Sequence, residues 1–300
     1  MRVLIAEYAT AESLGEFIYE GFAMLHTLVS SFQRIGCEVY YLTREILMNC
    51  GTPIFIQSFE RGIEEFSKEV DATLIIAPDE ILGEMTEKIH SENLGSPADS
   101  VRICADKLRC YERLEDEGIR TPFSCSSELY VVKPRFGCGC QNTFLSECAE
   151  SSDELISTPF IKGEHISVSA IGGEHPRALA ANEQFIIFEE SGKVRYDGNR
   201  TPIKVPEDIL ELAVRCGEIF GLRGYYGVDM VLGEEPFVVD VNPRVTTSVF
   251  SLSRVMREEI AEEILNEELS CTIDGSFEFR IRDLKKFFFK RRKKKKYKIP

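Results

Sequence analysis

The sequence predicts a protein of two parts, a parallel α/β lobe at the N-terminus followed by a larger α+β domain. In the first quarter of the chain, short runs of apolar and β-branched residues alternate with segments whose apolar residues recur every three or four positions. Strands that alternate with helices in this way favour a parallel sheet with helical crossovers. Later in the chain, strand patterns follow one another directly, which is typical of antiparallel sheets. The 300 residues are enough for both parts.

The N-terminal lobe is expected to cover residues 1–95. Its first helix follows from apolar residues at helical spacing after the first strand, and Gly36 ends it. A second helical pattern precedes the strand expected over 72–77, and a further helix begins at Pro78. A polar stretch with Gly and Pro at 91–97 closes the lobe. The expected strands are 2–6, 38–42, 53–57 and 72–77.

The second domain is expected to span residues 96–284 and to begin with a helix over 99–118. A lid subdomain follows at about 120–160, built on a strand over 129–133 and a glycine-bearing loop. An apolar hinge at 158–163 leads into the main sheet. Further strands are expected over 165–171, 177–189, 225–232 and 237–241, and further helices over 207–220 and 253–269.

Two acidic residues stand in otherwise apolar strands near the C-terminus. Asp229 and Asp240 flank a turn at 233–236 that predicts a hairpin, and Asn242 shares a strand face with Asp240. Carboxylates in such strands repel each other and lose hydration unless something compensates. Three oxygen ligands suit Mg²⁺ or Mn²⁺, and Arg244, two residues further, can grip phosphate or carboxylate oxygens. A surface hairpin with solvated acids is the alternative, which the apolar flanks disfavour.

A lysine and a glycine-bearing loop follow an apolar strand in the middle of the chain. Lys133 ends the strand, and Gly137 and Gly139 let backbone N–H groups approach phosphate oxygens while the ammonium group supplies charge. Lys107, which follows Asp106 on the preceding helix, offers a second ammonium group. The loop has neither the P-loop spacing nor the GxGxxG pattern of a Rossmann site. Taken alone, an ordinary hairpin and a surface lysine explain these residues equally well.

Taken in order along the chain, these features resemble the ATP-grasp superfamily. That family has a lysine after aspartate, a strand that ends in Lys-Pro before a glycine-rich lid, a hinge of the type FIxGExxSV, and a hairpin with Asp followed by acid-x-Asn-Pro-Arg. The corresponding residues here are Asp106-Lys107, Lys133-Pro134, Gly137, Gly139, Phe160 to Val168, and Asp229 with Asp240-Val241-Asn242-Pro243-Arg244. The resemblance covers residues 99–270. It implies the ATP-grasp fold, with ATP and two Mg²⁺ or Mn²⁺ ions as cofactors.

The resemblance also implies three groups of site residues, around the triphosphate, the nucleoside and the metals. Many relatives have an acid where this chain has His165 and a glutamate where it has Asp240, which is shorter. Backbone groups of the hinge would meet the adenine, and Glu164 or His165 would meet the ribose. The three groups are Lys107, Lys133, Gly137 and Gly139 for the triphosphate, Phe160, Ile161, Glu164 and His165 for the nucleoside, and Asp229, Asp240 and Asn242 for the metals.

The implied reaction begins with attack of a carboxylate on the γ-phosphate of ATP, and an amine then attacks the acyl phosphate. Cations, lysines and Arg244 would stabilise charge on the transferred phosphoryl group. Within the family, residues 20–24, 182–184, 196–198 and 242–248 together resemble the archaeal ligases that join the γ-carboxylate of L-glutamate to tyramine in methanofuran biosynthesis. The implied catalytic residues are Arg244 and Lys133, and the implied substrate residues are Glu20 at an ammonium group, Gln184, Arg244, Thr246 and Ser248.

The C-terminus is strongly basic. Ten Lys or Arg and no acids follow residue 284, which leaves a net charge of −24 on residues 1–284 against −14 for the whole chain. Such a block repels itself, so residues 285–300 are expected to form a disordered tail. The tail either rests on the acidic body or contacts nucleic acid, anionic lipid or an acidic partner. The phenylalanines at 287–289 pack either on the body or on a membrane surface.

The remaining features indicate the class of protein. Hydrophobic residues make up 43% of the chain, without a run long enough to span a membrane, so we expect a globular cytoplasmic protein. Ten scattered cysteines without a CxxC pair indicate free thiols in a reducing compartment. Small-molecule substrates are the expected partners, and a homo-oligomer is compatible with the sequence. The alternatives are an ATP-grasp ligase with a different acid or amine, a nucleotide-binding regulator without catalysis, and a nucleic-acid-binding protein led by the tail.

Overall fold

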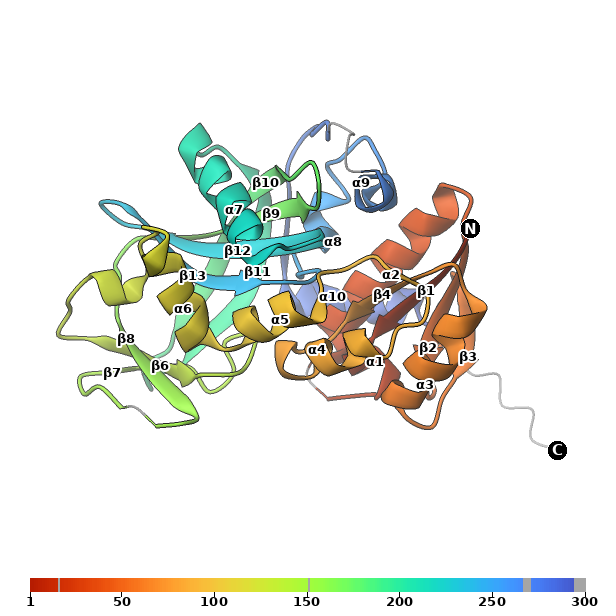
Figure 1. Ribbon diagram of the computed structural model, residues 1–300, viewed down its shortest axis with the longest axis horizontal. Coiled ribbons are helices and arrows are strands. Elements are labelled where there is room, and N and C mark those ends of the chain that lie inside the picture. Colours follow the sequence, from red (N-terminus) through yellow and green to blue (C-terminus); the bar gives the residue numbers. More distant parts are fainter. Residues whose placement is uncertain (16, 151, 267–270, 294–300) are drawn as a thin grey trace.

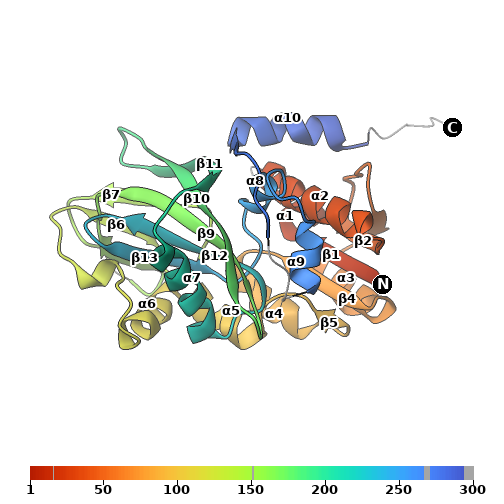
Figure 2. The ribbon, with the colours of Figure 1, turned by 90° about the horizontal axis from the view of Figure 1, so that it is seen from above.

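The structure, a computed structural model, describes residues 1–15, 17–150, 152–266 and 271–293. Figure 1 shows two lobes side by side, the N-terminal lobe in red and orange and the second domain in yellow, green and cyan. The last helices, in blue, return to the N-terminal lobe (Figure 2). Within the described ranges, no helix is both long and apolar enough to cross a membrane.

A five-stranded parallel sheet with helices on both faces forms the N-terminal lobe. Its elements are β1 (Arg2–Glu7), α1 (Tyr8–Ala11), α2 (Ile18–Arg34), β2 (Glu38–Thr43), β3 (Thr52–Phe55), α3 (Phe59–Phe66), η1 (Ser67–Glu69), β4 (Ala72–Ile76), α4 (Asp79–Glu87) and β5 (Glu92–Asn93). The strand order is β3-β2-β1-β4-β5. In β1, Val3 and Ile5 pack toward α2, while Leu4 and Ala6 pack toward α3 and α4. The expected parallel sheet, buried on both faces, is confirmed.

Two antiparallel sheets form the second domain. Its elements are α5 (Ala98–Ala105), α6 (Lys107–Asp116), η2 (Pro122–Ser124), β6 (Tyr130–Pro134), β7 (Phe144–Ser146), β8 (Leu155–Pro159), β9 (Glu164–Gly172), β10 (Arg177–Phe188), β11 (Val194–Ile203), α7 (Glu207–Phe220), β12 (Gly224–Leu232), β13 (Pro236–Asn242) and β14 (Phe277–Arg280). The larger sheet has the order β13-β12-β9-β10-β11-β14, and α7 packs against it. The smaller sheet, β7-β6-β8, carries the glycine-bearing loop. The mixed architecture expected from the sequence is therefore confirmed.

The structure corrects two helices that the sequence predicts as continuous. The segment 99–118 forms α5 and α6 because Asp106 between them is extended, with φ −87° and ψ 96°. The Asp106 carboxylate accepts two hydrogen bonds of 2.7 Å from Arg135, a contact that local sequence patterns do not reveal. The described part of 253–269 contains α9 (Ile260–Leu265) alone, after α8 (Val249–Leu252). The strand β11 was not expected because most of its residues are polar.

The expectation of a disordered tail is wrong for residues 285–291. These residues belong to α10 (Ile281–Arg291), which lies along the N-terminal lobe (Figure 2). Leu284 and Phe288 are buried, and the Phe288 ring packs edge-to-face on Phe22 of α2 with ring centroids 4.8 Å apart. Most basic side chains of α10 are exposed, so apolar burial stabilises the helix without burying its charges. Arg292 then forms an isolated β-bridge with Met48, so the expectation is wrong there too, and residues 294–300 of the expected tail lie outside the described residues.

Phe288→Ala is expected to lower the free energy of unfolding by about 3–5 kcal/mol, the usual cost of truncating a buried aromatic side chain. The neighbouring Phe289 is 54% exposed, so Phe289→Ala should change stability by only about 0.5 kcal/mol. Urea unfolding of both variants measures the difference. Equal small effects would mean that α10 does not pack on the lobe. Because α10 extends to Arg291, removal of the residues after Lys293 tests polyanion binding by the tail and leaves this helix intact.

Candidate functional site

A cavity of about 570 Å³ lies where the two lobes meet. Its walls come from the carboxyl ends of β1 and β4, from α2, from the loop after β6, and from the larger sheet. Glu164, one of the two residues expected at the ribose, is exposed and lines a separate hollow instead. The other predicted site residues line the cavity; they are Glu20, Lys107, Lys133, Gly137, Gly139, Phe160, Ile161, His165, Gln184, Asp229, Asp240, Asn242, Arg244, Thr246 and Ser248.

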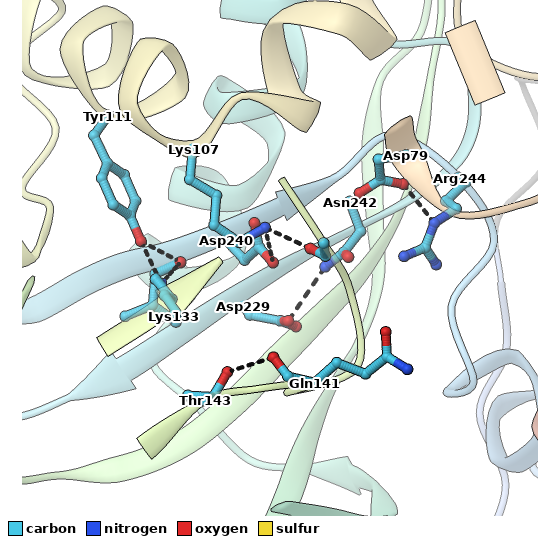
Figure 3. A network of polar contacts seen from close by, with 12 residues as sticks. Asp79, Lys107, Tyr111, Lys133, Gln141, Thr143, Asp229, Asp240, Asn242 and Arg244 are labelled. Atoms are coloured by element: carbon cyan, nitrogen blue, oxygen red, sulfur yellow. Dashed lines mark hydrogen bonds and ion pairs between the residues drawn. The ribbon is translucent and has the colours of Figure 1, made fainter. Parts of the chain in front are cut away.

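Two aspartates from neighbouring strands form the centre of the site (Figure 3). Asp229 on β12 and Asp240 on β13 are paired in the strand register. The Asn242 amide donates a hydrogen bond to one oxygen of Asp229 at 3.2 Å, and Gln184 donates to the other at 3.0 Å. Burial, with Asp240 nearby, raises the pKa of Asp229 to about 7. Because such a carboxylate pair is unfavourable without a cation, this oxygen-rich set fits Mg²⁺ or Mn²⁺.

Two lysines line the cavity beside these aspartates, and their partners differ. The Nζ atom of Lys107, the first residue of α6, lies 3.6 Å from the Asp240 carboxylate. Burial lowers the pKa of Lys107, but the combined attraction of Asp240 and Asp79 contributes to a net rise of that pKa. Lys133 donates to the Tyr111 hydroxyl at 2.7 Å and to the Val239 backbone oxygen at 3.2 Å. Among the described residues Lys133 has no ion-pair partner. Burial lowers its pKa, so an anion in the cavity would be needed to stabilise its charge.

The loop after β6 extends along the cavity from β6 to the opposite lobe. Gly137 and Gly139 have φ angles of 147° and 66°, a region that residues with side chains rarely adopt. The backbone oxygen of Gly137 accepts a hydrogen bond from Lys107 at 2.7 Å. A Cβ atom at Gly139 would lie 3.6 Å from the ring of Phe17, just before α2. The position expected for a lid is thus occupied by a glycine-bearing loop that touches both lobes.

Part of the cavity wall is apolar. The rings of Phe160 and Phe188 pack edge-to-face with centroids 5.7 Å apart, and the His165 ring lies at the same distance from Phe188. Burial lowers the pKa of His165, which favours the neutral imidazole. The backbone N–H of Phe160 already donates to Leu129 at 2.8 Å, so it is not free to bind a base. Of the two hinge residues expected at the adenine, Ile161 is the better candidate for a backbone contact.

An ion pair that the sequence analysis missed joins the lobes at the cavity. The Nε atom of Arg244 donates to Asp79, at the start of α4, at 2.6 Å. Both side chains are nearly buried, with 11% of Arg244 and 3% of Asp79 exposed. Burial lowers the pKa of Arg244, but Asp79, together with other negative groups that include Asp240, raises it overall, so the guanidinium stays charged. Acids are common at helix starts, so nothing in the sequence distinguished Asp79.

The N-terminal lobe also contributes two carboxylates, of which Glu7 is buried and Glu20 partly buried. Thr247 donates to Glu20 at 3.1 Å, and burial raises the pKa of Glu20. Glu7, which the sequence analysis also missed, accepts hydrogen bonds from two backbone N–H groups of α1, and burial raises its pKa to about 7. A Cβ atom at Gly21 would lie 2.3 Å from a Glu7 oxygen, so this position needs glycine. The surrounding apolar side chains are Tyr8, Leu14, Phe17 and Met24.

Comparison with known proteins identifies the family. Residues 104–248 match the model of the ATP-grasp domain. The chain is 31% identical over 295 residues to a tyramine–L-glutamate ligase of Methanocaldococcus fervens, and the alignment covers 91% of this chain and 97% of that protein. The chain belongs to the ATP-grasp family.

Other ATP-grasp proteins are similar over nearly the whole chain. A tyramine–L-glutamate ligase of Methanocaldococcus jannaschii is 28% identical, with 91% of this chain and 92% of that protein covered. Among solved structures, an ATP-grasp superfamily protein from Archaeoglobus fulgidus has a TM-score of 0.77 and 29% identity, covering 93% of this chain and 92% of that one. The ATP-grasp fold expected from the motif order is therefore confirmed, and the protein is an ATP-grasp ligase.

Proposed function

We propose that this ATP-grasp ligase joins the γ-carboxylate of L-glutamate to the amine of tyramine and converts ATP to ADP and phosphate. The observation that carries the proposal is one cavity that combines apolar hinge residues, the Asp229–Asp240 pair, two lysines, and an acidic, apolar part in the N-terminal lobe. Two relatives named for this reaction align over more than nine-tenths of their length. The product would be γ-glutamyltyramine, for methanofuran biosynthesis.

The triphosphate would lie beside Lys133, the lysine whose hydrogen-bond partners are both neutral, and beneath the loop at Gly137 and Gly139. His165, rather than the exposed Glu164, would lie at the ribose. Mg²⁺ or Mn²⁺ held by Asp229, Asp240 and Asn242 would neutralise charge on the phosphates. The loop at Gly137 and Gly139 and the two lysines would surround the phosphates, hold them in place and exclude water.

In the first step a carboxylate oxygen of glutamate forms a bond to the γ-phosphorus, and the bond from that phosphorus to the bridging oxygen of ADP breaks. In the second step tyramine attacks as the free amine, after its ammonium group has given a proton to water. Its nitrogen bonds to the acyl carbon, the bond from that carbon to the phosphate oxygen breaks so that phosphate leaves, and the nitrogen gives a further proton to water. Arg244 uses Nε for Asp79 and Nη1 for the Val245 backbone oxygen at 3.3 Å. Its Nη2 group is left for an oxygen of the transferred phosphoryl group.

The amine would bind at the acidic part of the cavity. Glu20 would take the ammonium group of tyramine, and the apolar side chains of Leu14, Phe17 and Met24 would contact its phenethyl body. The glutamate would be faced by Gln184, Thr246 and Ser248. Gln184 is held by its hydrogen bond to Asp229, and the other two follow Arg244 in the chain.

ADP release tests the proposal with ATP, L-glutamate and tyramine, against controls that omit one substrate. Release that requires both substrates, with γ-glutamyltyramine found by mass spectrometry, is the expected result. A panel of acids and of aromatic and aliphatic amines accompanies it. Faster turnover with another pair would replace the substrates and keep the ligase. Nucleotide binding without turnover in any combination would contradict ligation and indicate a regulator.

A further inference from the structure

Two fully buried asparagines lie beneath the cavity on neighbouring strands. Asn182 of β10 donates to the backbone oxygen of Ser167 at 3.0 Å and to its hydroxyl at 3.2 Å. Asn199 of β11 donates to the hydroxyls of Tyr196 at 3.2 Å and Ser248 at 3.1 Å. Neither asparagine has exposed surface. Asn182 also donates to the hydroxyl of Ser169 at 3.0 Å. Of the four accepting hydroxyl groups, those of Ser167, Tyr196 and Ser248 belong to residues that line the cavity.

The amide oxygens of both asparagines are held by other hydroxyl groups. Thr201 donates to the oxygen of Asn182 at 2.6 Å, and Ser251 of α8 donates to that of Asn199 at 2.6 Å. With their oxygens occupied, the two amides present N–H groups to the cavity hydroxyls. The packing of α8 on the larger sheet therefore sets the orientation of the amides.

A hydroxyl group that accepts a bond from an amide keeps its own proton for another acceptor. Among the described residues, no acceptor takes the proton of Tyr196. The hydroxyl oxygens of Ser167 and Ser248 are 3.3 Å apart, so one bond between them uses one of their two protons. At least two O–H donors are thus left for a ligand in the cavity.

This patch of donors lies among carboxylates. The acidic neighbours of the Tyr196 hydroxyl are Glu20 and Asp229, and burial together with these two raises its pKa, so the group stays protonated. The patch holds neutral donors and no cation. Because the two carboxylates would oppose the negative charge that develops on a bound carbonyl oxygen during attack, neutral O–H donors facing that oxygen are needed to offset it.

We propose that Tyr196 and Ser248 donate to the carbonyl oxygen of the reacting carboxyl group, and that Asn199 positions both hydroxyls. The inference rests on the proposed activation of a carboxylate, although not on which acid supplies it. When the amine attacks, the carbonyl π electrons move onto this oxygen, and they return as the bond to phosphate breaks. Donors that are already oriented stabilise the charge at that moment. Asn199 acts through the two hydroxyls as a positioning residue.

Tyr196→Phe tests the donor directly because it removes one oxygen and little volume. We expect kcat to fall about 100-fold, the lower end of the loss seen when one oxyanion donor is removed. The KM for ATP and the melting temperature should stay unchanged. Tyr226→Phe is the matched control, since its hydroxyl donates to the Ala213 backbone oxygen at 3.2 Å and Tyr226 does not line the cavity. Its turnover should stay near the wild-type value.

Asn199→Asp tests the positioning role. A carboxylate in place of the amide would accept the Tyr196 proton, so kcat should fall as in Tyr196→Phe. The double variant Tyr196→Phe/Asn199→Asp should then have the same kcat as the slower of the two single variants. Independent structural effects would instead add, and the double variant would be slower than both. If Asn199→Asp fails to fold, Ser248→Ala provides the second measurement, with a lowered kcat at unchanged KM for ATP.

The outcomes are separable. Turnover by the wild type together with an unchanged kcat in Tyr196→Phe would overturn the inference and leave the proposed function intact. A raised KM for the acid or the amine at constant kcat would also overturn it, because the hydroxyl would then serve only ground-state binding. A wild type that turns over no acid–amine pair would contradict the proposed function and this inference with it.

Discussion

Asp240→Asn is expected to lower kcat by more than about 100-fold, because changes to the outer partners of a metal site alone cost roughly 10- to 100-fold. Asp240 is paired with Asp229 in the strand register and lies 3.6 Å from Lys107. It would therefore contact both the expected cations and the lysine beside them. Asparagine keeps the shape of the side chain but brings no negative charge to a hard cation. Turnover at saturating ATP and metal measures the effect.

Mn²⁺ titration of the same variant separates the loss of metal from misfolding. Binding should weaken strongly while the melting temperature stays near that of the wild type. Asp208→Asn, on the exposed side of α7, is the matched control and should change neither property. If Asp240→Asn turned over at the rate of this control, Asp240 would not be a metal ligand.

Lys133→Ala is expected to raise the KM for ATP about 10- to 150-fold, which corresponds to the roughly 1.5–3 kcal/mol of a hydrogen bond to a charged group. Lys133 is held by the Tyr111 hydroxyl and the Val239 backbone oxygen, both neutral, so its charge is directed at the ligand rather than at another residue. Its removal should therefore weaken ATP binding without leaving a buried carboxylate unpaired. Steady-state kinetics with ATP as the varied substrate checks this.

Two further variants define the role of the lysine. Lys68→Ala removes an exposed lysine from the N-terminal lobe and should leave the KM for ATP unchanged. Tyr111→Phe keeps the charge of Lys133 but removes one of its two partners, so its effect should be smaller than that of Lys133→Ala. Unchanged ATP kinetics in Lys133→Ala would exclude this residue from the phosphate site.

Much of the fold could be predicted because it depends on patterns within single segments. The helix expected over 207–220 is found as α7 with those bounds, since its apolar residues recur at helical spacing. The errors lie where a distant contact decides the local structure. One error is the helix at 99–118, where the ion pair of Asp106 with Arg135 accompanies a break in a continuous helical pattern. Another is the basic segment after residue 284, whose charges predict disorder but whose Phe288 packs on Phe22 of α2.

The part of the candidate site that could be predicted consists of residues whose type is unusual for their surroundings. Asp229 and Asp240 are charges in apolar strands, and Lys133 ends another such strand. Asp79, Glu7 and Asn199 could not be predicted, because an acid at a helix start and a polar residue in a polar strand are ordinary in sequence. Their importance comes from burial and from their partners, which the sequence does not record.

The sequence by itself determined the two kinds of sheet, the aspartate hairpin and the family, because each depends on residue spacing or on motif order along the chain. Only the tertiary structure decided how the charges of the site are paired. Arg244 meets Asp79 from 165 positions away, and Lys133 meets Val239 from 106 positions away. The strength of a charge depends on what surrounds it after folding, and packing brings together groups that no local pattern relates.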